Sequence, residues 1–141
     1  MHCRGFTLVE LILTIVIVGI LAAVVGPRFF QRSNFDERLF YEEALAAVRY
    51  AQKLALASGC RTQVQLDDSL RLRRAAGCGS GLYTASVPGT DDLPVPENIS
   101  LSGNTFPVTF DSLGEAEAAA SVTIGGHVLR VHAPAGWIET P

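Results

Sequence analysis

The sequence predicts an α+β fold in which a long N-terminal helix packs on an antiparallel β-sheet. Three observations support this prediction. A nearly uninterrupted apolar run covers residues 6–25, and an amphipathic helical pattern follows over residues 33–57. From residue 60 onward, short segments of alternating polar and apolar residues are separated by turn-forming residues, which is typical of antiparallel strands. The first helix is expected to span a membrane and the second to carry the sheet.

The apolar run has only three polar residues, Thr7, Glu10 and Thr14. A helix of about 20 residues is about 30 Å long, which matches the hydrocarbon core of a bilayer. Arg4 precedes the run, so we expect the short N-terminal end to stay in the cytoplasm and the rest to lie outside. An ordinary secretory signal peptide is disfavoured, because the run is long and no small-x-small cleavage site follows it.

Glu10 is an unusual residue for such a helix. A carboxylate inside a lipid-spanning helix costs roughly 2.5 kcal/mol or more unless it is paired or reaches the interface. No Lys or Arg lies within helical reach inside the run, and Arg4 is the nearest cation. Two interpretations follow from the residues: Glu10 lies close enough to the interface to stay hydrated, or it meets a cation supplied by another subunit.

Residues 4–10, Arg-Gly-Phe-Thr-Leu-Val-Glu, resemble the class III signal of type IV prepilins. A short basic leader ends in Gly5, and a Phe-Thr-Leu-x-Glu sequence and an apolar helix follow it in register. The resemblance implies cleavage between Gly5 and Phe6 by a prepilin peptidase, and N-methylation of Phe6. It also implies that Glu10 pairs with the terminal amine of a neighbouring subunit during assembly, which would supply the missing cation.

The same resemblance implies a division of the chain and a location. Gly19 and Pro27 fall where pilins carry helix-weakening residues, since Pro cannot donate its backbone hydrogen bond. The expected parts are a leader (1–5), a transmembrane or filament-core helix (6–28), an amphipathic helix (29–59) and a β-rich pilin head domain (60–141). We expect a single-pass protein of the bacterial inner membrane with a periplasmic C-terminal domain, which later enters a pilus or pseudopilus. The implied partners are other pilin and minor pilin subunits, the prepilin peptidase and the inner-membrane assembly platform.

The second helical segment has one apolar stripe. Its residues follow the i, i+4, i+7, i+8 spacing of a helix face that packs against a partner. Ser33 and Asp36 resemble a capping box at its start, and Ser58-Gly59 is a typical end. The stripe consists of Phe40, Ala44, Ala47, Val48, Ala51, Leu54 and Ala55.

The partner of that stripe is predicted to be a sheet. Gly125-Gly126 is a good hairpin turn and places Val122 opposite Leu129. Residues 86–96 are rich in Pro and acidic residues and are interpreted as a loop, and residues 115–120 as a loop or a short helical turn. The predicted strands are Thr62–Leu66, Leu70–Arg73, Leu82–Val87, Ile99–Leu101, Phe106–Phe110, Val122–Ile124 and Val128–Ala133.

Cys60 and Cys78 flank the first predicted hairpin. Their midpoint is Ser69, which belongs to the predicted turn, and both share parity with the apolar residues of the two strands. Opposed cysteines on one face suit a disulfide, and an oxidising exported location favours it over two buried free thiols. Cys3 lies in the leader, so cleavage of the leader would leave two cysteines, which can pair with each other.

Two further segments resemble narrower groups. Phe110-Asp-Ser-Leu-Gly114, the Gly-Gly turn and Ala135-Gly136-Trp137 look like the end of pilin-like proteins of the GspH/FimT group. Residues 27–38 and 50–60 look closest to the minor prepilins of MSHA-type pili, the MshC group. This implies a minor type IV pilin that contributes to the assembly, initiation or tip of an MSHA-like pilus. The alternatives are a type II secretion pseudopilin like GspH and a DNA-binding minor pilin for DNA uptake like FimT.

No set of residues indicates an enzyme, a cofactor or a metal site. No phosphate loop, dinucleotide fingerprint or nucleophile elbow occurs in the sequence. His127 and His132 are five residues apart on one strand, which puts them on opposite faces, so solvated surface histidines are the better interpretation.

Arg71, Arg73 and Arg74 form a candidate basic patch on the first hairpin. The formal net charge is −3, which disfavours bulk attraction to nucleic acid. The patch also lacks interleaved aromatic residues. We therefore favour a solvated strand face that resists edge aggregation, and rank binding of nucleic acid below it.

Overall fold

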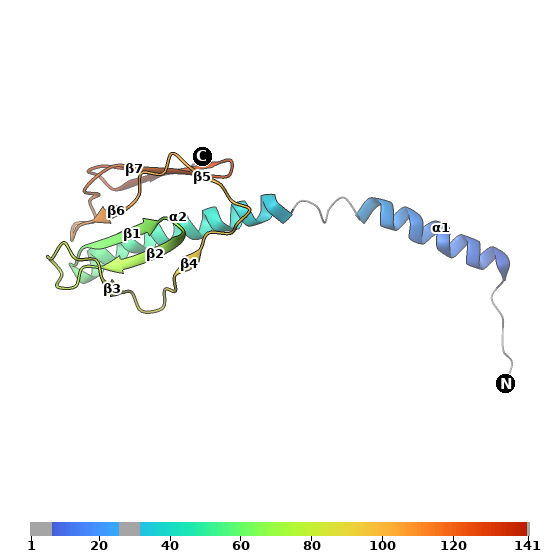
Figure 1. The fold of residues 1–141 in the computed structure, drawn as a ribbon, viewed down its shortest axis with the longest axis horizontal. Helices are drawn as coiled ribbons and strands as arrows, with labels where there is room; N and C mark the ends of the chain where they lie inside the picture. The colour runs from blue at the N-terminus through green and yellow to red at the C-terminus, as the bar shows by residue number, and fades with distance from the viewer. Residues whose placement is uncertain (1–6, 26–31, 141) are drawn as a thin grey trace, which may run out of the picture. The chain divides into compact units, whose positions relative to one another are not determined.

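The computed structural model describes residues 7–25 and 32–140. The chain falls into two compact units, Met1–Asn34 and Phe35–Pro141. Helix α1 (Leu8–Val25) lies in the first unit (Figure 1). Helix α2 (Arg32–Ser58) lies mostly in the second, which we call the C-terminal unit and which also contains every described strand.

Helix α1 carries its own N-terminal cap. The Thr7 hydroxyl accepts a hydrogen bond from the backbone N–H of Glu10 at 3.2 Å, and the Thr7 carbonyl accepts one from Leu11 at 3.1 Å. Thr7 and Glu10 therefore occupy the N-cap and N3 positions of a Thr-x-x-Glu sequence. The Thr14 hydroxyl donates to the Leu11 carbonyl at 2.8 Å, so both threonine side chains are bonded within the helix.

The large apolar side chains of α1 are exposed on all sides. Between Leu8 and Leu21 they keep 48–74% of their surface accessible. In the described ranges, no helix combines the length and the hydropathy that crossing a bilayer requires. The predicted span, residues 6–28, extends beyond α1 at both ends and stays a prediction. Gly19 lies inside α1, and Pro27 lies outside the described residues.

Helix α2 ends where the sequence predicts. Gly59 has a φ of 65°, in the left-handed region that glycine favours, and its N–H donates to the Ala55 carbonyl at 2.9 Å. The predicted apolar stripe faces the core, because five of its members are fully buried and Ala47 and Leu54 pack against them. Tyr41 and Leu45 are also buried, although the predicted stripe leaves them out.

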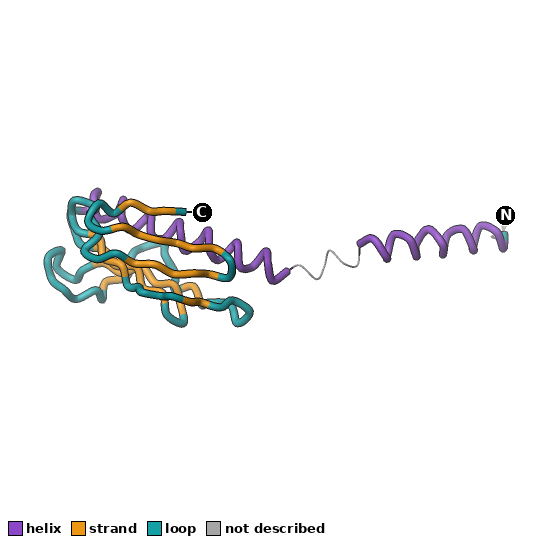
Figure 2. Tube along the Cα trace, turned by 90° about the horizontal axis from the view of Figure 1, so that it is seen from above, coloured by secondary structure: helices purple, strands orange, loops and turns teal. Residues whose placement is uncertain are grey.

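The strands form two antiparallel sheets (Figures 1 and 2). Sheet A has the order β3-β2-β1-β6, with β4 also paired to β2. Sheet B has the order β5-β7-β8-β9. Sheet A consists of β1 (Thr62–Leu66), β2 (Ser69–Arg74), β3 (Ala85–Ser86), β4 (Leu93–Pro94) and β6 (Val108–Phe110). Sheet B consists of β5 (Leu101–Ser102), β7 (Ala120–Ile124), β8 (His127–His132) and β9 (Trp137–Glu139).

One core joins α2 to both sheets. It includes Phe40 and Val48 from α2, Val64 and Phe110 from sheet A and Leu129 from sheet B. Because two sheets cover the helix, its buried surface is wider than a single stripe, which explains why Tyr41 and Leu45 are buried. The polar side of α2 also takes part, since the Gln52 amide donates to the carbonyls of Gly114 and Gly136 at 2.9 and 3.0 Å.

The first hairpin is centred one residue earlier than predicted. Leu66 pairs with Leu70, so the midpoint is Asp68 and not Ser69. The second predicted hairpin has the expected register, because Val122 pairs with Leu129 across the Gly125-Gly126 turn. The sequence determined the second register more sharply, since a two-residue Gly-Gly turn leaves less freedom than the acidic turn of the first hairpin.

Cys60 and Cys78 form the predicted disulfide, but not as ladder partners of the hairpin. The antiparallel bonding continues past β2 to Ala75, whose N–H donates to the Arg61 carbonyl at 2.9 Å. Cys78 lies in the following turn with a φ of 54°, and its carbonyl accepts from the Arg61 N–H at 3.2 Å. A turn that brings the chain back to Arg61 therefore places the two sulfur atoms together.

Several strand limits differ from the prediction. The predicted loop over residues 86–96 contains β4, and β9 was not predicted. The predicted strand Leu82–Val87 shrinks to two residues. Strands of two or three residues are too short for a periodic pattern, and partner strands far away in the sequence decide whether they form.

Candidate functional site

The N-terminal motif is the strongest candidate site of this chain. Gly5 and Phe6 lie outside the described residues, and the description begins with the Thr7 cap. Glu10 lies in the first turn of α1, where its backbone N–H is bonded to Thr7. A carboxylate in the first turn interacts favourably with the helix dipole, which contributes about 0.3–1 kcal/mol. Glu10 therefore has a local stabilising interaction besides any partner amine.

The capping role of Thr7 was missed in the sequence analysis, although its signal was present. Thr-x-x-Glu before an apolar run is the sequence form of a capping box. The cap gives the helix a defined start, and Glu10 is fixed one turn from it. A neighbouring molecule that approaches α1 would meet an apolar cylinder with a single carboxylate near its beginning. Exposed apolar surface of this extent marks a site that binds lipid or protein.

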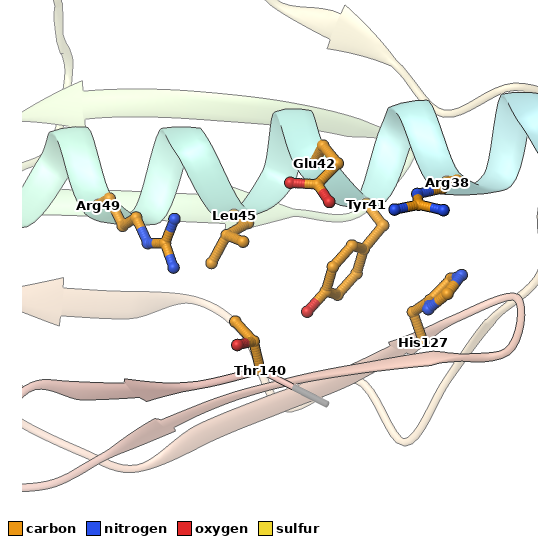
Figure 3. A pocket seen from close by; sticks show the side chains of 7 residues that line it. All are labelled: Arg38, Tyr41, Glu42, Leu45, Arg49, His127 and Thr140. Carbon is orange, nitrogen blue, oxygen red and sulfur yellow. The ribbon is translucent and has the colours of Figure 1, made fainter.

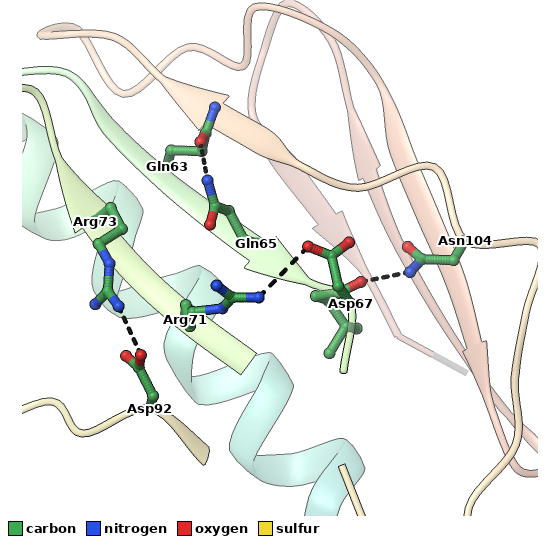
Figure 4. Close-up of polar contacts among 8 residues, drawn as sticks. Gln63, Gln65, Asp67, Arg71, Arg73, Asp92 and Asn104 are labelled. Carbon is green, nitrogen blue, oxygen red and sulfur yellow. Dashed lines mark hydrogen bonds and ion pairs between the residues drawn. The ribbon is translucent and has the colours of Figure 1, made fainter. Parts of the chain in front are cut away.

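The candidate basic patch is largely neutralised by the chain itself (Figure 4). Arg73 forms an ion pair with Asp92 at 2.6 Å, and Arg71 forms one with Asp67 at 3.7 Å. The Arg73 side chain is 20% exposed, so it is not a freely solvated cation. Arg74, at the end of β2, is half-buried. The patch offers less free positive charge than the sequence alone indicates.

The strand face around these arginines is a polar surface. Gln63 donates to the Thr109 hydroxyl at 3.1 Å. Figure 4 shows the neighbouring bond, in which Gln65 donates to the Gln63 side-chain oxygen at 2.7 Å. These residues share the outward parity of Arg71 and Arg73, opposite the buried apolar residues of β1 and β2. Such side-chain bonding favours a strand surface that is stabilised within the chain.

The two histidines lie on opposite faces of β8, as predicted, but both have side-chain neighbours. The His127 ring lies 5.1 Å from the Tyr41 ring. His132 stacks on Trp137 at 4.9 Å and contacts the Glu139 carboxylate at 2.8 Å. The His132 contact and the Arg130 hydrogen bond hold the pKa of Glu139 below its ordinary value. His132 is a surface residue, as predicted, with a side chain that is 42% exposed, and it also pairs with Glu139.

No group of three potential metal ligands occurs in the ranges 7–25 and 32–140. The polar side chains of the C-terminal unit form pairs and short networks, such as Arg61 with Glu117 at 3.3 Å and Arg130 with Glu139 at 3.0 Å. These contacts stabilise sheet surfaces.

Comparisons with known proteins agree with these features. A family model described as the prokaryotic N-terminal methylation motif matches residues 1–26. The type IV narrow pilus major component PilA5 of Thermus thermophilus is 42% identical over 55 residues, which are 39% of this chain and 47% of PilA5. The chain thus matches about half the length of this curated relative.

Two solved structures resemble the chain. The type IV minor pilin FimU of Pseudomonas aeruginosa superposes with a TM-score of 0.58 at 16% identity, covering 79% of this chain and 92% of FimU. The minor pseudopilin EpsH of the Vibrio cholerae type 2 secretion system gives a TM-score of 0.49 at 19% identity, covering 77% of this chain and 95% of EpsH. The FimU comparison shows that the C-terminal unit has a pilin fold.

The methylation motif and a long helix packed on antiparallel sheets together define the class of pilin subunits. In its N-terminal motif and its fold, this chain is similar to type IV pilins and minor pilins.

Proposed function

We propose that this protein is a minor subunit of an MSHA-like type IV pilus that helps to start, cap or tune the filament. The observation that carries the proposal is the methylation motif, matched over residues 1–26, together with the capped helix α1 inside it, whose large apolar side chains from Leu8 to Leu21 are exposed. Such a helix needs other apolar surfaces around it, and the core of a filament provides them. The resemblance of residues 27–38 and 50–60 to MSHA-type minor prepilins supports the narrower assignment.

The proposal includes processing at the N-terminus. The prepilin peptidase would cut after Gly5, and Phe6 would become the methylated first residue. Glu10 would then pair with the terminal amine of a neighbouring subunit at the assembly platform. Before assembly, residues 6–28 would anchor the protein in the inner membrane.

Intact-mass measurement of the protein extracted from membranes tests the processing. The expected mass is that of a chain that begins with Phe6 and carries one methyl group. Replacing Gly5 by a bulky residue should leave the full precursor, whereas Glu10→Gln should still be cut but should assemble poorly. A mature chain that begins elsewhere, or an uncut precursor in purified pili, would contradict the proposal.

A deletion strain tests the type of filament. Loss of surface pili, with secretion of folded enzymes intact, is the expected result for a pilus subunit. Normal surface pili together with failed secretion would identify a type II secretion pseudopilin instead. The DNA-uptake alternative is weakened by the ion pairs of Arg71 and Arg73 with Asp67 and Asp92. Salt-sensitive DNA binding that disappears when Arg71, Arg73 and Arg74 are replaced together would restore it.

A further inference from the structure

A cavity of about 510 Å³ lies between α2 and sheet B, within the C-terminal unit. Figure 3 shows side chains of α2 entering it from one side, and His127 of β8 and Thr140, which follows β9, closing the other. This volume is within the range of cavities that bind ligands, about 300–1,000 Å³. Its lining residues are Arg38, Tyr41, Glu42, Leu45, Arg49, His127 and Thr140.

Tyr41 places a buried donor in this cavity. The residue is only 4% exposed, and its hydroxyl has no hydrogen-bond partner among the described residues. The hydroxyl points into the cavity, and the ring lies beside His127 at 5.1 Å (Figure 3). Burial, and then the Glu42 carboxylate, raise the pKa of Tyr41, so the phenol stays protonated at neutral pH. Buried polar groups without partners are rare, so this hydroxyl indicates an acceptor that is supplied from outside.

Two cations lie at the two ends of the cavity. Arg38 is at the end near His127, and Arg49 is at the end near Thr140 (Figure 3). They are eleven positions apart on α2, which corresponds to about 16 Å along the helix axis. In the part of the chain that the structure describes, neither forms an ion pair, and Glu42 is the single carboxylate of the lining.

We propose that this cavity binds an extended acidic segment of another polypeptide, with one carboxylate at Arg38 and one at Arg49. The Tyr41 hydroxyl would donate to an acceptor of the segment between these two positions. A compact anion such as phosphate reaches only one guanidinium at a time, because the two are far apart along α2. An extended chain with two acidic side chains fits both the spacing and the central donor. This binding site goes beyond the proposed role in a filament and does not depend on the filament type.

A pair of short peptides tests the proposal with the full chain in nonionic detergent. The acidic peptide is acetyl-Glu-Gly-Gly-Gly-Glu-amide, in which both Glu side chains point to the same side of an extended chain, and its neutral match replaces both Glu by Gln. Fluorescence anisotropy of labelled peptides should show saturable binding of the acidic peptide and at least about tenfold weaker binding of the neutral one, since each charge-assisted hydrogen bond contributes that much. Equal binding of both peptides, or no saturable binding, would overturn the proposal.

Variants separate this site from general attraction to a charged surface. Arg38→Gln and Arg49→Gln should each weaken binding about tenfold or more, and Tyr41→Phe should weaken it severalfold without lowering the unfolding temperature. Lys53→Gln removes one exposed positive charge of α2 outside the cavity and is the matched control. An effect of Lys53→Gln equal to that of the two Arg variants would contradict the site. Inorganic phosphate that competes fully at concentrations near the peptide's would show that the site takes any small anion, and would overturn the assignment of an extended segment.

Discussion

Helix α1 and the C-terminal unit differ in whether their apolar side chains are buried. From Leu8 to Leu21, the large apolar side chains of α1 are exposed around the helix, and the hydroxyls of Thr7 and Thr14 are bonded to its backbone. In the C-terminal unit, α2 is covered by two sheets, and one continuous core contains residues from all three. The C-terminal unit thus buries its apolar side chains in a core of its own, whereas the described side chains of α1 from Leu8 to Leu21 form no such core.

The largest expected loss of stability follows from truncating a side chain in the core, which only the C-terminal unit possesses. Phe110 is fully buried in β6, so Phe110→Ala should lower the free energy of unfolding of this unit by about 3–5 kcal/mol. The helicity of α1 should not change, because α1 shares none of this core. Thermal unfolding followed by tyrosine and tryptophan signals measures the loss. Leu113→Ala is the control, since Leu113 is 71% exposed, and a comparable loss there would contradict the core assignment.

Removal of the disulfide should cause the next largest loss of stability. Replacing Cys60 and Cys78 together by Ser should destabilise the C-terminal unit by about 3 kcal/mol, according to the loop-closure estimate. Chemical denaturation with and without a reducing agent measures the difference. Reduction should affect the native chain and leave the double variant unchanged. Finding both thiols free in non-reducing peptide maps of the exported protein would refute the bond.

The cap of α1 should have a smaller and strictly local effect. Thr7→Ala removes the acceptor for the Glu10 N–H and should destabilise the first turn by about 1 kcal/mol, whereas Thr7→Ser should retain the bond. Hydrogen exchange of the amides of residues 8–11 in detergent measures it. A change in the unfolding temperature of the C-terminal unit would contradict a strictly local effect of the cap.

The smallest expected change in stability comes from the Glu139 carboxylate on the surface of sheet B. The pKa of Glu139 is lowered by hydrogen bonds from His132 and Arg130, so its carboxylate is stabilised in the folded state. This contribution is present above the pKa of the unfolded chain and is lost as the pH falls through the lower folded value. Glu139→Gln should therefore flatten the pH dependence of the unfolding temperature below about pH 4.5. An unchanged acid profile would contradict the pairing.

The sequence by itself determined the features that depend on neighbours along the chain. The start of α1, the end of α2 at Gly59 and the Gly125-Gly126 turn all follow from residues within a few positions of each other. The methylation motif belongs to the same group, because its leader, junction and Glu10 are contiguous. Local periodicity and capping signals suffice for such features, since helical hydrogen bonds and tight turns are themselves local.

Only the tertiary structure decided the features that depend on distant partners. The strands divide into two sheets, and this division buries Tyr41 and Leu45, which a single stripe leaves exposed. Asp92 comes from a segment predicted to be a loop and reaches Arg73 across 19 positions, so the candidate basic patch is paired. The short strands β4 and β9 exist because longer neighbours supply their hydrogen bonds. Pairing between distant segments leaves no periodic trace in strands of two or three residues, so the sequence alone did not reveal it.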